Sequence, residues 1–254
     1  GIYAYNGSRL AISNTVFSNN SGPYGGAFGA QSGVGAFSFT NCVFIDNLST
    51  VNGAVALLWY SQPSTWTNCT VVRNNQVGGL EAVYLASDTH AFSNTILWNN
   101  FSAVAGGGTR TFANCLVQGS GGSASWNSAI GTNNGGNRDE DPQFLNTSDP
   151  DGVDNRWMTA DDGYRLRGGS GAANTGSGGS ATDILGQSRT VGLGGNPDMG
   201  AYEGRCPVVS FAAASGTVAE SVGSALVSVN LTGVADYPVT VTYAGNGTGT
   251  ATDG

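Results

Sequence analysis

The sequence predicts an all-β chain whose first half forms a right-handed parallel β-helix, a solenoid of short strands. Two observations lead to this prediction: an asparagine-centred block that recurs about every 27 residues, and an unusual composition. The chain holds 41 glycines and only 10% charged residues, whereas typical domains hold about 7% glycine and about 25% charged residues. Such a composition indicates many short strands joined by tight turns.

The repeated block has the form apolar-x-Asn-(Cys/Thr)-x-apolar. Its asparagines are Asn14, Asn41, Asn68, Asn94 and Asn114, at intervals of 27, 27, 26 and 20 residues. A second asparagine follows six residues later, at Asn20, Asn47, Asn74 and Asn100. A further apolar strand lies between the blocks, at 1–4, 26–30, 53–57 and 81–85. Each coil therefore offers about three short strands.

In a solenoid each strand pairs with its counterpart one coil away, at about 4.8 Å, so like positions stack as ladders. The block predicts three inward ladders: Ile12/Phe39/Trp66/Phe92/Phe112, Thr15/Cys42/Cys69/Thr95/Cys115 and Phe17/Phe44/Val71/Leu97/Val117. On the remaining strand the expected inward residues are Ile2, Phe28, Val55 and Val83. The block asparagines are expected to bend the chain in the left-handed conformation and to hydrogen-bond along their own pile.

Other repeat folds fit less well. A left-handed hexapeptide helix requires a period of about 18 residues, and a propeller blade requires about 40. The Asn-Cys/Thr-x-apolar block, with the Gly-Gly-Ala strand upstream of it, resembles the pectate-lyase-like right-handed β-helix superfamily over residues 1–120. That resemblance implies the fold and says little about activity.

Residues 121–204 are expected to form the last coil and a C-terminal cap. The stretch 120–138 is polar and glycine-rich, as in a loop or an imperfect coil. The motifs at 139–144, 162–166 and 198–203 resemble the C-terminal region of bacterial choice-of-anchor Q proteins. This resemblance implies a secreted or cell-surface protein of the bacterial envelope. Because an open solenoid end exposes strand edges, we expect 139–203 to cover the end of the core.

Residues 208–254 have the period-two alternation of an antiparallel β-sandwich. They resemble the first half of a Calx-beta module, so an incomplete sandwich is expected. Glu220 matches a position that helps to bind calcium in some members of that family, but the partner acids are absent here.

One acidic loop is a candidate calcium site. Calcium prefers clustered carboxylate and carbonyl oxygens, and a tight loop brings several of them together. The candidate ligands are Asp149, Asp151, Asp154, Asp161 and Asp162. The alternative is a loop in which these side chains cap backbone amides. No other cofactor is expected.

A row of tyrosines is a candidate polysaccharide-binding surface. Tyr3, Tyr5, Tyr60 and Tyr84 fall on or beside the first strand of successive coils, and some should point outward. Flat aromatic rings on a parallel sheet are suited to stacking on sugar rings. The alternative is that these are incidental surface residues.

No catalytic residues are assigned. The coils contain few charged residues: Arg9, Asp46, Arg73, Glu81, Asp88 and Arg110. A glycoside hydrolase requires two carboxylates at a defined separation, and these acids occupy different coil positions. The lone histidine, His90, is expected to be structural. The competing hypothesis is a polysaccharide lyase or glycoside hydrolase whose active coils lie upstream.

The net charge, the length of the apolar runs and the cysteine positions give three further expectations. A net charge of −8 argues against nucleic acid as a partner, because that affinity depends on Lys and Arg. No apolar run approaches the length of a transmembrane helix. Cys42 and Cys69 should stack on adjacent coils, close enough for a disulfide, although free buried thiols are favoured. The sequence thus predicts a non-catalytic, adhesion-type surface protein whose expected partner is a polysaccharide or cell-surface glycan.

Overall fold

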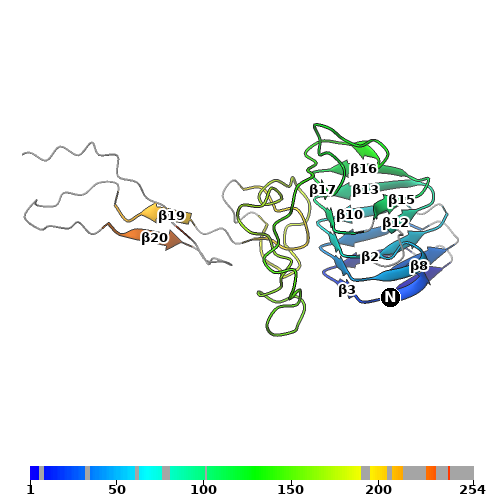
Figure 1. Cartoon of the computed structure of the whole chain (residues 1–254), viewed down its shortest axis with the longest axis horizontal. Coiled ribbons are helices and arrows are strands. Elements are labelled where there is room, and N and C mark those ends of the chain that lie inside the picture. The colour runs from blue at the N-terminus through cyan, green and yellow to red at the C-terminus, as the bar shows by residue number, and fades with distance from the viewer. Residues whose placement is uncertain are drawn as a thin grey trace, which may run out of the picture. The chain divides into compact units, whose positions relative to one another are not determined.

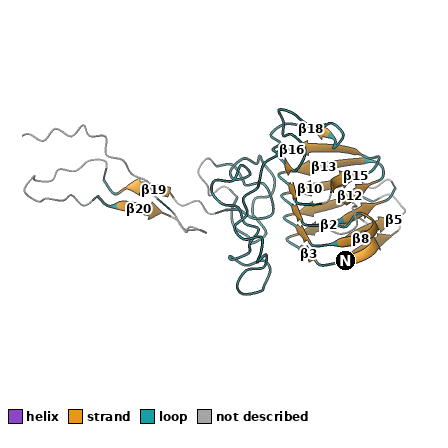
Figure 2. Ribbon diagram, viewed as in Figure 1, coloured by secondary structure: helices purple, strands orange, loops and turns teal. Residues whose placement is uncertain are grey.

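The computed structural model describes residues 1–5, 9–31, 35–60, 63–75, 81–100, 102–189, 195–204, 208–213, 227–232 and 240. The chain divides into two compact units, Gly1–Gly204 and Arg205–Gly254. Every regular element in the described residues is a β-strand, and they contain no helix (Figure 2). The predicted all-β class is therefore confirmed.

The first unit contains a β-solenoid that is made of three parallel sheets (Figure 1). Sheet A contains β1 (Ile2–Tyr5), β5 (Phe28–Gln31), β9 (Ala56–Leu58), β12 (Glu81–Leu85) and β15 (Ser102–Ala105). Sheet B contains β2 (Leu10–Ser13), β6 (Phe37–Thr40), β10 (Ser64–Thr67), β13 (Thr89–Ser93), β16 (Thr109–Ala113) and β18 (Thr132–Asn133). Sheet C contains β3 (Val16–Ser18), β7 (Val43–Ile45), β11 (Thr70–Val72), β14 (Ile96–Trp98) and β17 (Leu116–Val117). A short parallel pair, β4 (Ser21–Tyr24) and β8 (Leu48–Asn52), connects sheet C to sheet A in two coils.

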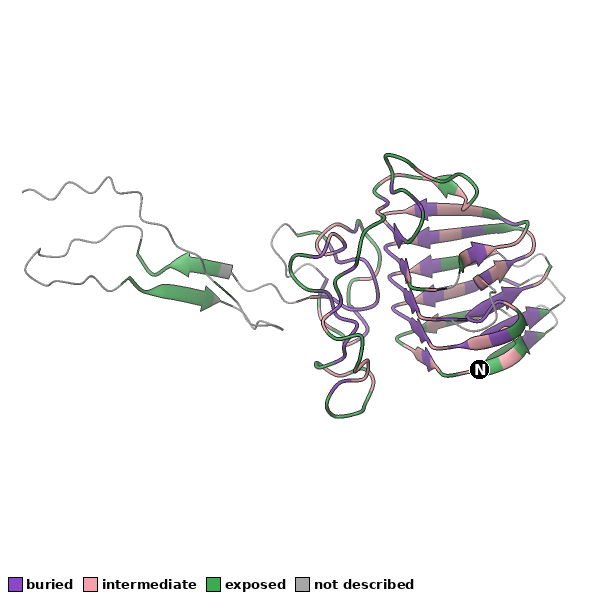
Figure 3. Cartoon of the chain, viewed as in Figure 1, coloured by how far each residue is buried: buried purple, intermediate pink, exposed green. Residues whose placement is uncertain are grey.

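The predicted ladders of sheets B and C are confirmed. The register pairs Ile12 with Phe39, Phe39 with Trp66, and so on to Phe112. The rings of this ladder stack inside the core: Phe39 lies 4.2 Å from Trp66, and Phe92 lies 4.8 Å from Phe112 between ring centroids. The ladder from Phe17 to Val117 is paired in the same way. Purple segments along these strands in Figure 3 mark the buried core that results.

Sheet A departs from the expected register by one residue. Val55 is buried as predicted, but the ladder partner of Phe28 is Ala56, which in turn pairs with Val83. The cause lies just upstream, where the pairing of β4 with β8 shifts by one residue between Gly22 and Tyr24. Such an irregularity adds a residue to one coil and changes which side chain continues the ladder.

The block asparagines bend the chain as predicted. All five adopt left-handed backbone conformations, with φ between 48° and 52°. The continuous amide ladder, however, is built by the second set of asparagines: the side-chain amide of Asn20 donates to Asn47, that of Asn47 to Asn74, and that of Asn74 to Asn100, at 2.9–3.0 Å. In the described residues the block asparagines form one such bond, from Asn41 to Asn14.

Cys42, Cys69 and Cys115 are buried free thiols, as favoured by the sequence. Cys42 and Cys69 donate to backbone carbonyls at 3.4–3.6 Å, and Cys69 is within reach of Cys42. Burial raises the pKa of the Cys115 thiol to about 12. Cys206 lies outside the described residues.

Residues 139–189 and 195–204, together called the lateral segment, lie along the outward face of sheet C (Figure 1). A second apolar cluster joins sheet C to this segment: Val43, Ile45, Val72, Ile96 and Leu116 pack with Phe144, Tyr164, Leu166, Met199, Ala201 and Tyr202. Residues 139–203 were expected to cover the end of the core, and the described ones pack on the side of the solenoid, against sheet C. Sheet C is apolar on both faces, and its outward face requires a cover of its own.

The last coil is covered instead by residues 120–138. β18 extends sheet B beyond β16. Trp126 and Ile130 pack on the core, and the Trp126 ring lies 5.5 Å from that of Phe112. The stretch expected to be a loop or an imperfect coil thus shields the terminal core residues from water.

In the second unit the structure describes one antiparallel pair, β19 (Val208–Phe211) with β20 (Val229–Thr232). Of the other residues in this unit, the structure describes only 212–213, 227–228 and 240. Glu220 and the remaining strands predicted for this region lie outside the described residues. Within the described part of the chain, no helix is long and apolar enough to cross a membrane.

Candidate functional site

The predicted tyrosines lie on or beside sheet A. Tyr3 and Tyr84 share one outward ladder, separated by Gly29 and Leu57. They are three strands apart, which corresponds to about 14 Å. The Tyr3 ring lies against Gly29, where an added Cβ would approach it to 2.8 Å, and its hydroxyl donates to the side chain of Gln31 at 2.5 Å. Gly29 thus makes room for an aromatic ring that its hydroxyl ties to the neighbouring strand.

Tyr5 ends β1, and Tyr60 follows β9 by two residues. Tyr3, Tyr5 and Tyr60 are 56%, 57% and 55% exposed, whereas Tyr84 is half-buried. Tyr60 has a φ of 84°, a conformation that is strained for a residue with a side chain.

Sequence reasoning missed two further aromatic residues of this surface. Tyr24, at the end of β4, contacts Trp59 edge to face, with 6.0 Å between ring centroids. Neither residue belongs to the tyrosine repeat. The signal that was available is the adjacent pair Trp59-Tyr60 after a buried strand, because two successive aromatic side chains cannot both point inward there.

In the acidic loop the carboxylates bond neighbouring groups. Asp154 accepts from the backbone N–H of Arg156 at 2.9 Å, and Asp161 accepts from the Thr159 hydroxyl at 2.7 Å. Asp162 is buried and accepts from the Tyr202 hydroxyl at 2.6 Å. The backbone carbonyls of Asp149 and Asp151 accept turn hydrogen bonds. Such contacts are those expected of the alternative, a loop whose acidic side chains cap nearby backbone amides.

Across the described residues, no group of three or more His, Cys, Asp or Glu side chains is arranged to hold a metal ion. The calcium site stays a prediction. A rise in melting temperature when calcium is added to the wild type, absent from the Asp151→Ala/Asp154→Ala variant, would support it. An unchanged melting temperature in the wild type would count against it.

Four of the charged residues of the coils have structural partners. The Arg73 guanidinium pairs with Asp46 on the adjacent coil, Glu81 accepts from the backbone of Gly53, and Asp88 accepts from the backbone of Thr89. His90 is fully buried, with one ring nitrogen on the Ser64 hydroxyl and the other on the Ser87 carbonyl. Burial lowers the pKa of His90. Both ring nitrogens are thus used in hydrogen bonds within the core, as expected of a structural histidine.

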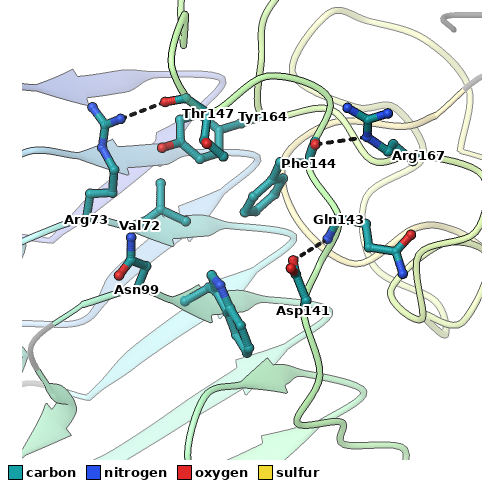
Figure 4. Close-up of a pocket in the computed structure, with 10 residues that line it drawn as sticks. Val72, Arg73, Asn99, Asp141, Gln143, Phe144, Thr147, Tyr164 and Arg167 are labelled. Carbon is teal, nitrogen blue, oxygen red and sulfur yellow. Dashed lines mark hydrogen bonds between the residues drawn. The ribbon is translucent and has the colours of Figure 1, made fainter.

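A cavity of about 520 Å³ lies between sheet C and the lateral segment (Figure 4). Sequence reasoning did not find it, because its two walls are distant in sequence and only docking brings them together. The solenoid contributes Val72, Arg73, Trp98 and Asn99; the lateral segment contributes Asp141, Gln143, Phe144, Thr147, Tyr164 and Arg167.

Backbone pairing fixes the wall that the lateral segment contributes. Phe144 and Leu166 form an isolated antiparallel bridge, and the backbone N–H of Arg167 donates to the carbonyl of Gln143 at 3.1 Å. The Arg73 guanidinium reaches across to the Thr147 carbonyl at 2.7 Å. The two walls are therefore held together by direct hydrogen bonds as well as by apolar packing.

Comparison with known proteins does not assign the chain to a family. No protein-family model matches it, and no curated protein matches its sequence.

Proposed function

We propose that this chain belongs to a non-catalytic, adhesion-type surface protein of the bacterial envelope that binds polysaccharide through the outward face of sheet A. The observation that carries the proposal is the set of exposed aromatic side chains on that face. Tyr3, Tyr5 and Tyr60 are each more than half exposed, and Trp59, which precedes Tyr60, contacts the Tyr24 ring.

The physical argument rests on the regularity of the sheet. Rings mounted on parallel strands recur at multiples of about 4.8 Å, so a linear polymer can contact several of them along the solenoid axis. Tyrosine loses little conformational entropy when it binds, and it offers both an apolar face and a hydroxyl. Many weak contacts along one polymer add up to useful affinity through effective concentration.

The β-solenoid supports placing residues 1–120 in the pectate-lyase-like superfamily as part of this proposal. The choice-of-anchor Q resemblance of 139–203 and the Calx-beta resemblance of 208–254 supply the extracellular, envelope-associated setting. The acidic surface, with a net charge of −8, favours neutral polysaccharides as the partner over polyanions.

The test is a pull-down of the whole chain on a panel of insoluble polysaccharides, including cellulose, chitin, xylan and peptidoglycan. We expect the Tyr3→Ala/Tyr5→Ala/Tyr60→Ala variant to bind at least about tenfold more weakly than the wild type, because stacking contacts of this kind dominate such interfaces. The matched control is Phe211→Ala, which removes an aromatic side chain that is 66% exposed in the second unit.

Two results would contradict the proposal. The first is a wild-type chain that binds none of the polysaccharides, or a triple variant that binds as well as the wild type. The second is the release of reducing ends or unsaturated uronates during incubation, which would reveal catalysis.

A further inference from the structure

We propose that the cavity between sheet C and the lateral segment binds one unit of a neutral saccharide (Figure 4). This goes beyond the proposed function because it concerns a different sheet, different residues and a soluble ligand. The cavity volume, about 520 Å³, falls within the range of about 300–1,000 Å³ that is typical of small-molecule sites.

The cavity has an apolar side. Val72 and Phe144 are buried residues of its wall, and Trp98, at the end of β14, is only partly buried. The Phe144 ring meets Tyr164 edge to face, with 4.8 Å between centroids. Such a surface suits the C–H face of a pyranose ring, which is flat and apolar.

One buried polar atom in the lining has no partner. The Tyr164 side chain is 2% exposed, and its hydroxyl makes no hydrogen bond to any described residue. Leaving a buried hydroxyl unsatisfied costs about 1–3 kcal/mol. Burial raises the pKa of Tyr164 to about 12, so the hydroxyl keeps its proton and is available as a donor as well as an acceptor. A small movement of the surrounding side chains would let a sugar hydroxyl or ring oxygen satisfy it.

The charges of the lining favour a neutral ligand. The Arg73 guanidinium is paired with Asp46. The Arg167 guanidinium donates to the carbonyls of Phe144 and Leu145, at 3.3 and 2.7 Å. The other charged group in the lining is the carboxylate of Asp141, which repels anions. Because both cations already have partners and a carboxylate stands among them, the cavity is not built as an anion site.

Planar polar side chains complete the lining. Asp141, Gln143 and Arg167 lie on exposed positions of the lateral segment, and Asn99 lies opposite them on the solenoid. Carboxylate and amide groups can each bond two neighbouring hydroxyls at once, which is the pattern that a sugar presents. The cavity thus combines an apolar wall, an unsatisfied phenol and planar polar groups. This combination suits a pyranose better than it suits a purely apolar or an ionic ligand.

The test is titration with soluble neutral trisaccharides (cellotriose, chitotriose and mannotriose), followed by calorimetry and tryptophan fluorescence. The titrations use the Tyr3→Ala/Tyr5→Ala/Tyr60→Ala chain, which lacks the three exposed tyrosines of sheet A; the cavity variants described next then assign any remaining signal to the cavity. We expect at least one trisaccharide to bind with a dissociation constant of about 0.1–10 mM. Failure of the sheet A proposal would leave this result unchanged.

Two variants in that background examine the contacts. Tyr164→Phe keeps the ring and its contact with Phe144 but removes the hydroxyl, and we expect about tenfold weaker binding with an unchanged or higher melting temperature. Trp98→Ala should abolish the fluorescence change and weaken binding, whereas Phe211→Ala should do neither. The proposal is overturned if no neutral trisaccharide binds, if only acidic saccharides bind, or if Tyr164→Phe retains full affinity.

Discussion

The Nη2 atom of Arg189 donates a hydrogen bond to Oδ1 of Asn41 at 3.0 Å, joining two residues that are 148 positions apart. The same guanidinium donates to the carbonyls of Gly200 and Ala201 at 3.0 and 2.9 Å and pairs with Glu203 at 3.4 Å. A single buried cation thus ties the lateral segment to an asparagine bend of the solenoid.

The neighbouring bends are used in the same way. Asn68 accepts from the backbone of Ser180 at 3.1 Å, and Asn94 accepts from the backbone of Ser177 at 2.9 Å. The side chain of Asn41 also donates to the Thr182 carbonyl at 2.8 Å. Three of the block asparagines therefore turn the chain with their backbone and hold the lateral segment with their amides.

Arg189→Met should strongly destabilise the first unit. The substitution leaves the buried carbonyls of Gly200 and Ala201 and Oδ1 of Asn41 without their donor, and each buried acceptor left unsatisfied costs about 1–3 kcal/mol. Chemical denaturation measures the loss, and limited proteolysis should show earlier cleavage within residues 139–204. Arg156→Met, at an exposed position, is the control and should change stability by less than about 0.5 kcal/mol. Equal stability of the two variants would show that Arg189 does not anchor the segment.

Docking of the lateral segment should weaken as the pH rises. Burial, and secondarily the nearby Asp198, raise the pKa of Glu203 from 4.5 to about 8, although Arg189 opposes this shift. A raised folded-state pKa means that the stabilisation is fully present below about pH 4.5 and is lost as the pH rises through about 8. The melting temperature should therefore fall between pH 5 and pH 9.

The groups around Glu203 define the control for this prediction. Asp183 and Asp198 are buried acids nearby, and burial raises the pKa of Asp198 as well. Glu203→Gln removes one titrating group and leaves these two, so its melting temperature should depend less steeply on pH than that of the wild type. A wild-type melting temperature that rises from pH 5 to pH 9 would refute the assignment.

Asn74→Ala should interrupt the amide ladder. The side chain of Asn74 donates to the carbonyls of Phe44 and Val72, each at 2.9 Å, and accepts from the backbone of Asn47. Its removal leaves these buried groups unsatisfied, so we expect a loss of about 2–4 kcal/mol in urea denaturation. Asn134→Ala, on an exposed asparagine, should have almost no effect. A loss no larger than that of this control would mean that the ladder contributes nothing to stability.

The buried thiols should be unreactive in the folded chain. Cys42, Cys69 and Cys115 are fully buried, and burial raises the pKa values of Cys69 and Cys115. In a Cys206→Ser background, a thiol reagent at pH 8 should label none of them until denaturant is added. Burial closes all three off from the reagent, and at Cys69 and Cys115 it also disfavours the thiolate, which is the reactive form. The hydrogen bond with Cys69 lowers the pKa of Cys42, so Cys42 is protected by burial alone. Labelling of the native chain at the rate seen in denaturant would show that the core opens readily.

The ladders of sheets B and C were predictable because an apolar residue repeated at a fixed distance from an asparagine has a single consistent stacking. The partner of Phe28 was not, because the irregular pairing of β4 with β8 inserts a residue that no local pattern marks. The tyrosine surface was predicted in part. Tyr24 and Trp59 joined it only when two non-adjacent elements met.

The sequence by itself determined the periodic features of this protein: the parallel solenoid, its aromatic core ladder and the left-handed bends at its asparagines. Each of these follows from residues one coil apart, which stack whatever the rest of the chain does. The tertiary structure decided where residues 139–204 lie, which asparagine amides form the continuous ladder, and that a cavity exists beside Trp98 and Tyr164. These features depend on contacts between the repeated coils and a segment that contains no repeat. Because hydrophobic burial is non-directional, no local sequence pattern predicts the geometry of such contacts.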